Sequence, residues 1–451
     1  MEKNQVLQLN IESYGAFGEG VSHVDGYAVF IPYACVGEVV TAQILSVKKG
    51  YAYAKLLSVE SPCKDRREPK CPYFKKCGGC DLQHLSYSAQ LELKRKSVQE
   101  TLRRVGGVDI EVDEVFPSFS EYDCRNKLTL PFSTDKNGVI LGFYSERSHR
   151  VVGIKECVLS DWSKKLLEIV LNWANSNALT VYSEETKKGV LRSLSARVAG
   201  GRIMITLVVT RESVPALSSL TEELKTTYPD GIFYLNINKK DTNVVLGDKC
   251  ILVFGEERLS SEALGIKYEL SPLSFAQVND KVRDGLYTEV ISNINDGDIV
   301  VDAYSGAGLM SVLASKKAKM VYGVEIIEDA VKDADKTAKL NAVSDKIQNT
   351  VGDCGEILPT LLKDIRKIHP KAPVTIILDP PRKGCDESVL KAVLSCGADK
   401  IIYVSCNPAT LARDLKTLCT SYYVHSVKPF DMFPETKHVE SVVCLKRQIQ
   451  Q

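Results

Sequence analysis

The most restrictive feature of the sequence is a regular alternation of apolar and amphipathic segments that begins near residue 297. The short apolar segments read DIVVDAY, MVYGVE, VTIILD and KIIYVS. Between them lie segments with helical spacing of apolar residues, such as EDAVKDADKTAKLNA and ATLARDLKTL. Apolar strands that alternate with helices are typical of a parallel sheet covered on both faces. We therefore predict an α/β fold, a doubly wound Rossmann-like domain over residues 271–451, with ligand sites at the carboxyl ends of its strands.

Two further regions precede this domain. Residues 1–60 contain short alternating strands broken by the glycine-rich GAFGEG, which predicts a small OB-like β-barrel. Residues 61–270 begin with a cysteine-containing loop and a basic helix that Ser86 or Ser88 caps, and then alternate strands with two helical stretches. This second pattern predicts an α+β central domain. Small barrels commonly bind nucleic acid, although this one could equally be a packing module.

Composition limits the class of protein. The chain has 451 residues, of which 44% are hydrophobic and 25% charged, so we expect it to fold throughout. No apolar run is long enough to span a bilayer and the first residues do not resemble a secretory signal, which predicts a cytoplasmic protein without a membrane partner. We also expect a monomer. The net charge is only +1, but residues 63–104 are strongly basic and form either a polyanion-facing surface or a solvated one.

The first apolar strand of the last domain leads into DAYSGAG, residues 302–308, whose glycines allow a tight turn beneath a ligand. The next strand ends in Glu325, the position from which an acidic side chain binds ribose hydroxyls in dinucleotide folds. The third glycine of a dinucleotide fingerprint is absent, which favours an adenosine ligand without pyrophosphate. Asp353 could close the adenine side of this site. Solvated loop positions are the alternative interpretation of both carboxylates.

The next two strands end in residues suited to catalysis. Asp379 begins the motif DPPR, and its two prolines hold the aspartate at a fixed place above the sheet. Cys406 precedes Asn407 and Pro408, a helix cap and first turn, so its sulfur should lie near the positive end of a helix. A helix N-terminus can lower the pKa of a thiol, which predicts a favoured thiolate at Cys406. Cys385 is the nearest rival nucleophile but lacks the helix.

A second group of cysteines lies in CPYFKKCGGC, residues 71–80, and in KECVLS, which contains Cys157. In a reduced compartment, closely spaced cysteines more often bind metal than form disulfides. Cys71, Cys77, Cys80 and Cys157 therefore suit an iron–sulfur cluster or a zinc site, and the spacing does not choose between them. Cys63 lies nearby in the sequence and could be an extra or substitute ligand.

Taken together, these motifs resemble the RNA uracil-5-methyltransferases that use S-adenosylmethionine, a family whose tRNA and 23S ribosomal RNA enzymes carry an N-terminal barrel called TRAM. The resemblance covers nearly the whole chain. It rests on GAFGEG, CPYFKKCGGC, SFAQVN, DAYSGAG, DPPRKG, VSCNPATLARD and DMFPETKHVES.

The resemblance implies a role for each candidate residue. It implies that a 4Fe-4S cluster is bound by Cys71, Cys77, Cys80 and Cys157. It implies that the S-adenosylmethionine site is lined by Gln277, Tyr304, Glu325 and Asp379, with a looser match at Asp353. Cys406 would be the nucleophile and Glu440 the base. The implied substrate is structured RNA, with 23S ribosomal RNA preferred to tRNA.

The chemistry of uracil makes these roles intelligible. Carbon 5 of the ring accepts a methyl group only after a thiolate adds to carbon 6 and generates an enolate, and a base must then remove the carbon 5 proton. An amino-group methyltransferase would need no cysteine at position 406, and an RNA cytosine enzyme would carry a second cysteine at the DPPR turn. A non-enzymatic iron–sulfur RNA-binding protein is the alternative from another class, and it predicts no binding of the methyl donor.

Overall fold

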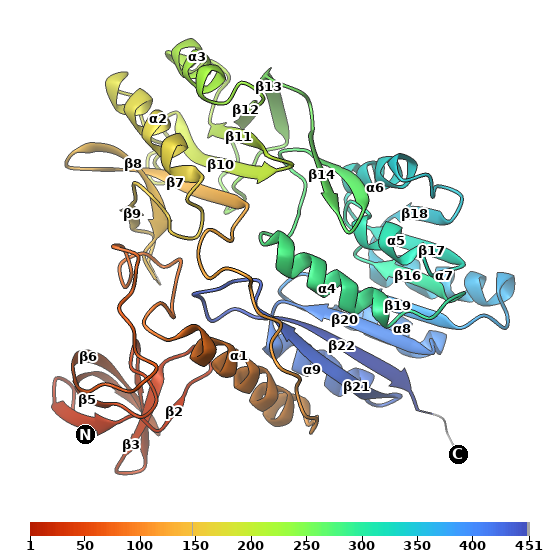
Figure 1. Ribbon diagram of the computed structural model, residues 1–451, viewed down its shortest axis with the longest axis horizontal. Helices are drawn as coiled ribbons and strands as arrows, with labels where there is room; N and C mark the ends of the chain where they lie inside the picture. The colour runs from red at the N-terminus through yellow and green to blue at the C-terminus, as the bar shows by residue number, and fades with distance from the viewer. Residues whose placement is uncertain (147, 449–451) are drawn as a thin grey trace.

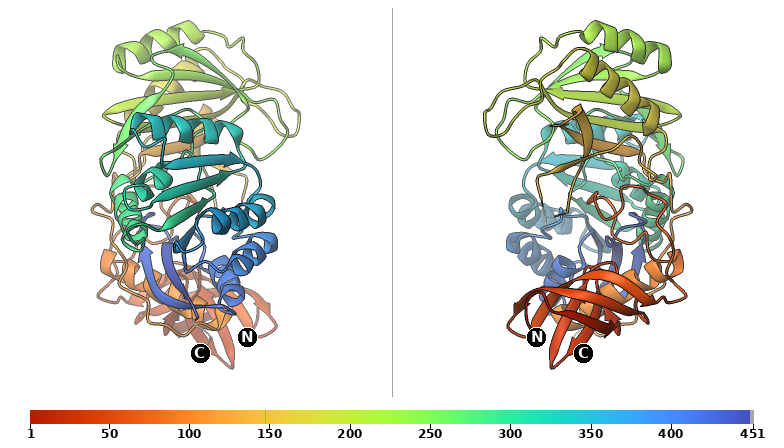
Figure 2. Two further views of the ribbon diagram at one scale, coloured as in Figure 1. Left: turned by 90° about the vertical axis from the view of Figure 1, so that its right-hand side faces the viewer. Right: turned by 90° about the vertical axis from the view of Figure 1, so that its left-hand side faces the viewer.

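The computed structural model describes residues 1–146 and 148–448, and it contains three sheet-based regions. Figure 2 shows the N-terminal sheet at the bottom, the C-terminal sheet in the middle and the central sheet at the top. Among the described residues, no helix combines the length and apolar character needed to cross a membrane.

The N-terminal sheet has six strands in the order β1-β5-β6-β4-β3-β2. Its neighbours are antiparallel except for β4 and β6, which run parallel. Alternate residues of β4, β5 and β6 point into one apolar core that includes Val29, Ile44 and Ala52. The strands are β1 (Val6–Asn10), β2 (Ser13–Tyr14), β3 (Gly20–Val24), β4 (Tyr27–Ile31), β5 (Val39–Lys48) and β6 (Tyr51–Ser61).

The basic helix α1 (Tyr87–Thr101) follows the cysteine-containing loop, and Ser86 caps it by accepting a hydrogen bond from Ala89 N at 3.3 Å. The helix continues into a π-helical turn, η1 (Leu102–Gly106), that ends at Gly107 in the left-handed conformation. Val98 and Leu102 lie in the same apolar core as the C-terminal sheet. The helix thus packs on the C-terminal domain, whereas the division of the chain at residues 60 and 270 stays a prediction.

The central sheet has seven strands in the order β13-β12-β11-β10-β7-β8-β9. Two helices cover one of its faces, and the apolar residues between them form a core around Leu166, Leu207 and Phe233 (Figure 1). A separate two-stranded sheet, β14 and β15, leads to the C-terminal domain. These elements are β7 (Lys127–Asp135), β8 (Gly138–Tyr144), β9 (Val151–Gly153), α2 (Ser163–Ser176), β10 (Leu191–Ala199), β11 (Arg202–Val209), α3 (Leu217–Thr227), β12 (Ile232–Ile237), β13 (Lys249–Phe254), β14 (Leu259–Ala263) and β15 (Ile266–Leu270).

The C-terminal sheet has seven strands in the order β18-β17-β16-β19-β20-β22-β21. The first five strands in this order are parallel, as the alternation of strands and helices predicts. The last two form an antiparallel pair that the sequence pattern did not reveal. The elements are α4 (Asp280–Ser292), β16 (Ile299–Ala303), α5 (Leu309–Ala314), β17 (Met320–Glu325), α6 (Glu328–Leu340), β18 (Ile347–Val351), α7 (Cys354–Ile368), β19 (Val374–Leu378), α8 (Glu387–Cys396), β20 (Lys400–Ser405), α9 (Pro408–Leu418), β21 (Tyr422–Phe430) and β22 (Glu440–Arg447).

Candidate active site and cysteine cluster

The candidate nucleophile and base meet because β22 is antiparallel to the rest of the sheet. Ser405, the last residue of β20, is the register partner of Ser441 on β22. Cys406 follows Ser405 and Glu440 precedes Ser441, so both residues lie one position beyond this pair at the same edge of the sheet. The amino end of β22 therefore lies at the same edge as the carboxyl ends of β16, β17, β19 and β20, where doubly wound sheets bind their ligands.

Burial and like charges raise the pKa values of two carboxyl groups at this edge, those of Glu440 and Asp379. Glu440 is only 4% exposed, and burial together with the nearby Asp379 raises its pKa to about 8. Burial and Asp302 raise the pKa of Asp379 to about 7. The Arg382 guanidinium acts in the opposite direction on Glu440. Perturbed carboxyl groups of this kind are typical of functional sites.

The structure contradicts the prediction of a favoured thiolate at Cys406. The predicted helix start is present, since α9 begins at Pro408 and the Asn407 side chain accepts a hydrogen bond from Ala409 N at 3.1 Å. Burial and the Glu440 carboxyl nevertheless raise the pKa of Cys406 to about 11, although Arg382 lowers it. The prediction failed chiefly because the fold buries the thiol, and also because a carboxyl group 34 residues away in the sequence becomes its neighbour.

A tight turn follows β16 and faces the end of β17. Tyr304 has a φ of 67° in this turn, and the backbone N–H groups of Tyr304 and Ser305 both donate to Val324 O. Gly308 begins α5 with a φ of 78°, and a Cβ atom there would lie 2.7 Å from the Cβ of Ala334. Only glycine therefore allows this close approach of the turn to α6.

The carboxylate of Glu325 lies at the end of β17 and joins this turn. Its Oε2 accepts a hydrogen bond from Gly306 N at 3.1 Å, and its Oε1 accepts one from Ile327 N at 2.9 Å. Behind the turn, Asp302 is 1% exposed and accepts a 2.5 Å hydrogen bond from Ser311 Oγ, and burial raises its pKa to about 7. The predicted donor residues Tyr304 and Glu325 thus lie at the ends of neighbouring strands.

Two other predicted donor residues have structural contacts of their own. Asp353 is exposed and caps α7 by accepting a hydrogen bond from Gly355 N at 2.8 Å. Gln277 is 6% exposed and lies in the segment between β15 and α4. Its backbone carbonyl oxygen accepts a hydrogen bond from Asn126 Nδ2 at 3.1 Å. The rival nucleophile Cys385 is 4% exposed, and burial raises its pKa to about 12.

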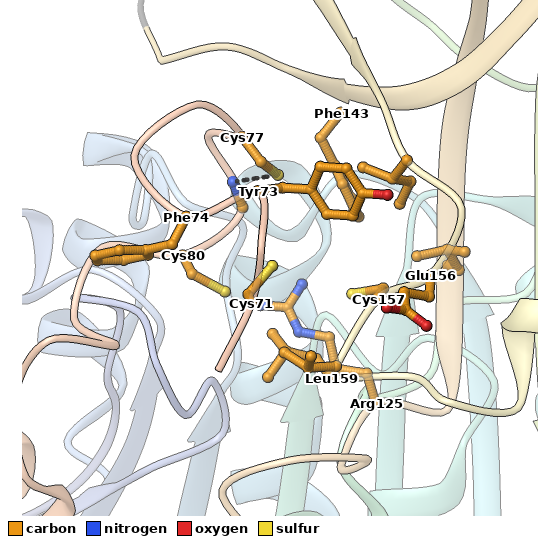
Figure 3. A pocket seen from close by; sticks show the side chains of 14 residues that line it. Cys71, Tyr73, Phe74, Cys77, Cys80, Arg125, Phe143, Glu156, Cys157 and Leu159 are labelled. Carbon is orange, nitrogen blue, oxygen red and sulfur yellow. Dashed lines mark hydrogen bonds between the residues drawn. The ribbon is translucent and has the colours of Figure 1, made fainter. Parts of the chain in front are cut away.

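Four cysteine side chains from two distant segments line one cavity (Figure 3). Cys71, Cys77 and Cys80 come from the loop before α1, and Cys157 comes from the segment between β9 and α2. The cavity is otherwise mostly apolar and includes Tyr73, Phe74, Leu128, Phe143, Ile154, Val158 and Leu159. Burial raises the pKa of Cys77 to about 11 and also raises those of Cys71 and Cys80.

Arg125 also lines this cavity, and its side chain reaches between Cys71 and Cys157 in Figure 3. Its Nε is buried and has no hydrogen-bond partner in residues 1–146 and 148–448. The backbone holds the residue in place, because Arg125 N donates to Leu159 O at 2.8 Å and Trp162 Nε1 donates to Arg125 O at 2.7 Å. No sequence signal pointed to this arginine, because it lies 45 residues from Cys80.

Cys63 does not line the cavity. Its Sγ lies within 4.8 Å of Cys35 Sγ and of a Glu38 carboxylate oxygen. Glu38 is 1% exposed, accepts a hydrogen bond from Cys35 N at 2.8 Å and forms a two-point ion pair with Arg66. The ion pair between Glu38 and Arg66 joins the loop to the N-terminal sheet. Cys63 thus lies outside the four-cysteine cavity, and the structure gives no support to its being an extra or substitute ligand there.

Much of the basic segment is paired within the chain. Lys94 on α1 is fully buried and forms an ion pair with Asp431. Arg67 forms ion pairs with both Glu121 and Glu435. Carboxylates of the same chain therefore neutralise Lys94 and Arg67. These two side chains do not support the interpretation of the segment as a surface that faces a polyanion. A charge count along the sequence does not reveal pairs this distant.

Comparison with known proteins identifies the chain. A family model described as tRNA (Uracil-5-)-methyltransferase matches residues 86–448, and a TRAM domain model matches residues 2–57. The chain belongs to this methyltransferase family. It is an RNA methyltransferase that uses S-adenosylmethionine and carries an N-terminal TRAM domain.

Individual relatives agree with this family. Proteins named uncharacterized RNA methyltransferase are 39% identical in Clostridium tetani and 40% identical in Halalkalibacterium halodurans, and each alignment covers 99% of this chain and at least 97% of the relative. A solved structure of the Pyrococcus abyssi tRNA (uracil-54, C5)-methyltransferase with S-adenosyl-L-homocysteine is 27% identical, with a TM-score of 0.76. The match covers 97% of this chain and 100% of that one. The predicted fold classes are confirmed: an N-terminal TRAM barrel, an α+β central domain and a Rossmann-like methyltransferase domain.

Proposed function

We propose that this methyltransferase transfers a methyl group from S-adenosylmethionine to carbon 5 of a uridine in 23S ribosomal RNA, through a covalent bond between Cys406 and carbon 6. The observation that carries the proposal is the strand register, which brings Cys406 and Glu440 together at the ligand-binding edge of the sheet. A pair of thiol and buried carboxyl group suits a reaction that needs both a nucleophile and a base.

Cys406 would begin the reaction by adding its sulfur to carbon 6 of uracil. Since the pKa of Cys406 is about 11 in the free protein, only a small fraction of the thiol is ionised at neutral pH. The charge on the Arg382 side chain lowers that pKa and so favours the thiolate. A uridine inside folded RNA must also leave its stack to reach the sulfur, as in other enzymes that act on a nucleobase.

Glu440 would complete the reaction by taking the proton from carbon 5 after methyl transfer. The electrons of that carbon–hydrogen bond then reform the ring double bond, and the sulfur of Cys406 leaves carbon 6. With a pKa of about 8, Glu440 holds a substantial deprotonated fraction only as the pH approaches that value. Asp379 would hold the ring by hydrogen bonds from the neighbouring strand end.

The residues around the turn after β16 fit the methyl donor. S-adenosylmethionine supplies an electrophilic methyl group when it is bound. Glu325 would bind the ribose hydroxyls, and Tyr304, Gln277 and Asp379 would line the remainder of the site. The close approach of Gly308 to Ala334 supports this assignment, because it shapes the turn that a nucleoside needs. Asp353 would contact the adenine from the start of α7.

A 4Fe-4S cluster fits the four-cysteine cavity better than a single zinc ion. Tetrahedral zinc with bonds of about 2.3 Å holds its sulfur ligands roughly 3.8 Å apart. Among the described residues, no three of these four sulfur atoms lie within 4.8 Å of one another. A cluster separates its ligands more widely, because each thiolate binds a different iron atom. The unpartnered Nε of Arg125 supports the same assignment, since an anionic cluster would accept its hydrogen bond.

When present, such a cluster would join Cys157 to the loop before α1 and add no step to the methyl transfer. Cys71, Cys77, Cys80 and Cys157 would bind it, and Arg125 would balance part of its charge. Anaerobically purified protein should then show a broad visible absorption. Stoichiometric zinc without iron would contradict this assignment.

A tRNA is the second candidate substrate. The likeness to the Pyrococcus abyssi tRNA enzyme favours it, whereas the resemblance of this chain's motif set favours ribosomal RNA. The two are separated by incubating the protein with labelled S-adenosylmethionine and transcripts of either RNA, followed by mass spectrometry of the nucleosides. We expect 5-methyluridine in the 23S transcript. Methylation of the tRNA transcript alone would transfer the proposal to tRNA, and methylation at another atom would overturn it.

A further inference from the structure

Two cations lie side by side on the central sheet, and neither forms an ion pair within the part of the chain that the structure describes. Arg197 on β10 is the register partner of Lys127 on β7, so both side chains leave the same face of the sheet at adjacent positions. Arg197 is 5% exposed, and its Nε and Nη2 atoms are buried without a hydrogen-bond partner among the described residues. Lys127 is half-buried, and Arg197 is the one charged group found to act on it within the described residues.

These side chains point away from the helices of the central domain. The adjacent residues Leu128 and Ala196 lie in the apolar core beneath α2 and α3. Because successive strand residues point to opposite faces, Lys127 and Arg197 lie on the face that these helices do not cover. Thr129 and Ser195 share that face and are joined by a hydrogen bond of 2.9 Å between their hydroxyl groups. Beside these polar side chains the same face is apolar, because Met204, the register partner of Arg197 on β11, lies in a separate core with Tyr234.

The carboxylate that acts on Arg197 already has other partners. Asp280 attracts Arg197, but its Oδ1 accepts hydrogen bonds from Arg283 Nη1 at 2.6 Å and from Asn126 Nδ2 at 2.9 Å. Asn126 directly precedes Lys127 and also donates to the carbonyl oxygen of Gln277. The two cations therefore lie next to the segment that leads into the proposed methyl-donor site.

An unpaired charge in such a place is costly. Burial lowers the pKa of Lys127 to about 8 and that of Arg197 to about 10, which reflects the cost of keeping both groups charged where neither forms an ion pair within the described residues. Buried charges in proteins are normally paired, and an orphaned buried donor calls for an explanation. A bound anion would satisfy the free Nε and Nη2 donors in the planar geometry that a guanidinium offers.

We propose that Lys127 and Arg197 form a subsite for an oxyanion carried by one of the substrates. The inference rests on the proposed function, because that function supplies two such groups: a backbone phosphate of the RNA and the carboxylate of S-adenosylmethionine. Both present oxygen atoms to which a guanidinium can donate two hydrogen bonds. The position on the central domain, outside the Rossmann-like domain, favours the phosphate. Such a contact would hold the RNA strand beside the extruded uridine.

The test compares Arg197→Met and Lys127→Met with the wild-type full-length chain. Affinity for the 23S and tRNA transcripts is measured at several salt concentrations, and affinity for S-adenosyl-L-homocysteine is measured by calorimetry. Lys249→Met is the matched control, because it removes a cation from β13 of the same sheet where an exposed ion pair with Glu212 exists. Thermal unfolding shows whether each variant is folded.

For a phosphate subsite, each variant should weaken RNA binding about tenfold and reduce the slope of log affinity against log salt by roughly 0.7 to 1. For a carboxylate subsite, affinity for S-adenosyl-L-homocysteine should fall tenfold with an unchanged salt slope. Arg197→Met should unfold at an equal or higher temperature, because an unpaired buried charge is replaced by an apolar chain of similar length. The control should change none of these quantities.

The proposal is overturned if both variants keep wild-type affinity for RNA and for S-adenosyl-L-homocysteine. A large loss of stability in Arg197→Met would also overturn it, because it would show that the cation has a partner in the folded chain. If the wild-type chain methylates neither transcript, the proposed function fails, and the S-adenosyl-L-homocysteine measurement alone then decides the subsite.

Discussion

Replacing Glu440 by Gln should stabilise the protein at alkaline pH. Burial and Asp379 raise the pKa of Glu440 from 4.5 to about 8, so the folded protein favours the neutral carboxyl group and the unfolded chain favours the carboxylate. The contribution of this group to stability is therefore complete below pH 4.5 and is lost as the pH rises through about 8. The amide of the Glu440→Gln variant has no proton to lose in this range, so it would escape this penalty.

The magnitude follows from the change in pKa. A rise from 4.5 to about 8 corresponds, at about 1.4 kcal/mol for each pKa unit, to an upper limit of about 5 kcal/mol. Water penetration and local relaxation reduce such penalties, so we expect about 2 kcal/mol between acidic and alkaline pH. In a domain of this size, about 2 kcal/mol shifts the midpoint of thermal unfolding by roughly 4–8 °C.

The assay is thermal unfolding of wild-type and Glu440→Gln protein from pH 5 to pH 9. Titration of groups that do not interact with Glu440 cancels in the difference between the two proteins. Glu387→Gln is the control, because Glu387 is exposed on α8 and pairs with Lys391. The midpoint of Glu440→Gln should rise above that of the wild type as the pH increases. A difference that is the same at pH 5 and pH 9 would refute the assignment of a buried, protonatable Glu440.

Other variants test the remaining assignments. Glu325→Ala should weaken S-adenosyl-L-homocysteine binding by roughly 10- to 100-fold in calorimetry and leave RNA affinity intact, because a carboxylate at that strand end binds the ribose; unchanged affinity would contradict this role. Cys77→Ser should remove the visible absorption. It should also speed hydrogen exchange around Cys157 more than in the C-terminal sheet, because the cluster joins two distant segments. An equal increase in exchange in both regions would contradict this role of the cluster. Lys94→Met should destabilise the protein by about 3–5 kcal/mol in chemical denaturation because it leaves Asp431 buried and unpaired, and adding Asp431→Asn should restore most of the loss. No recovery in the double variant would argue against the pair.

The sequence predicts those parts of the fold that depend on local pattern. The parallel strands β16, β17, β19 and β20 follow from apolar segments that alternate with helices, and α1 begins at the predicted Ser86. Cys406 was identifiable because it ends such a strand and precedes a helix cap. These features depend on residues that are close together in the sequence, where periodicity and capping act.

Features that depend on distant residues could not be derived in this way. Burial, together with the Glu440 carboxyl that the antiparallel β22 places beside Cys406, raises the pKa of a thiol that the helix start alone would lower. Lys94 looked like part of a basic surface until the fold paired it with Asp431, 337 residues away. Arg382 stood within the motif DPPRKG, but only its action on both Cys406 and Glu440 shows its electrostatic role.

The most direct test of the proposed mechanism is to trap the bond between protein and RNA. Wild-type, Cys406→Ala and Glu440→Gln proteins are incubated with the 23S transcript and S-adenosylmethionine, denatured, and separated by gel electrophoresis, with Cys419→Ala as the cysteine control. Glu440→Gln should accumulate a slowly migrating complex with methylated RNA, because the carbon 5 proton stays and the sulfur cannot leave. Cys406→Ala should form neither complex nor product. Normal turnover by Glu440→Gln, or a complex that persists in Cys406→Ala, would contradict the account and make Cys385 the next nucleophile to test.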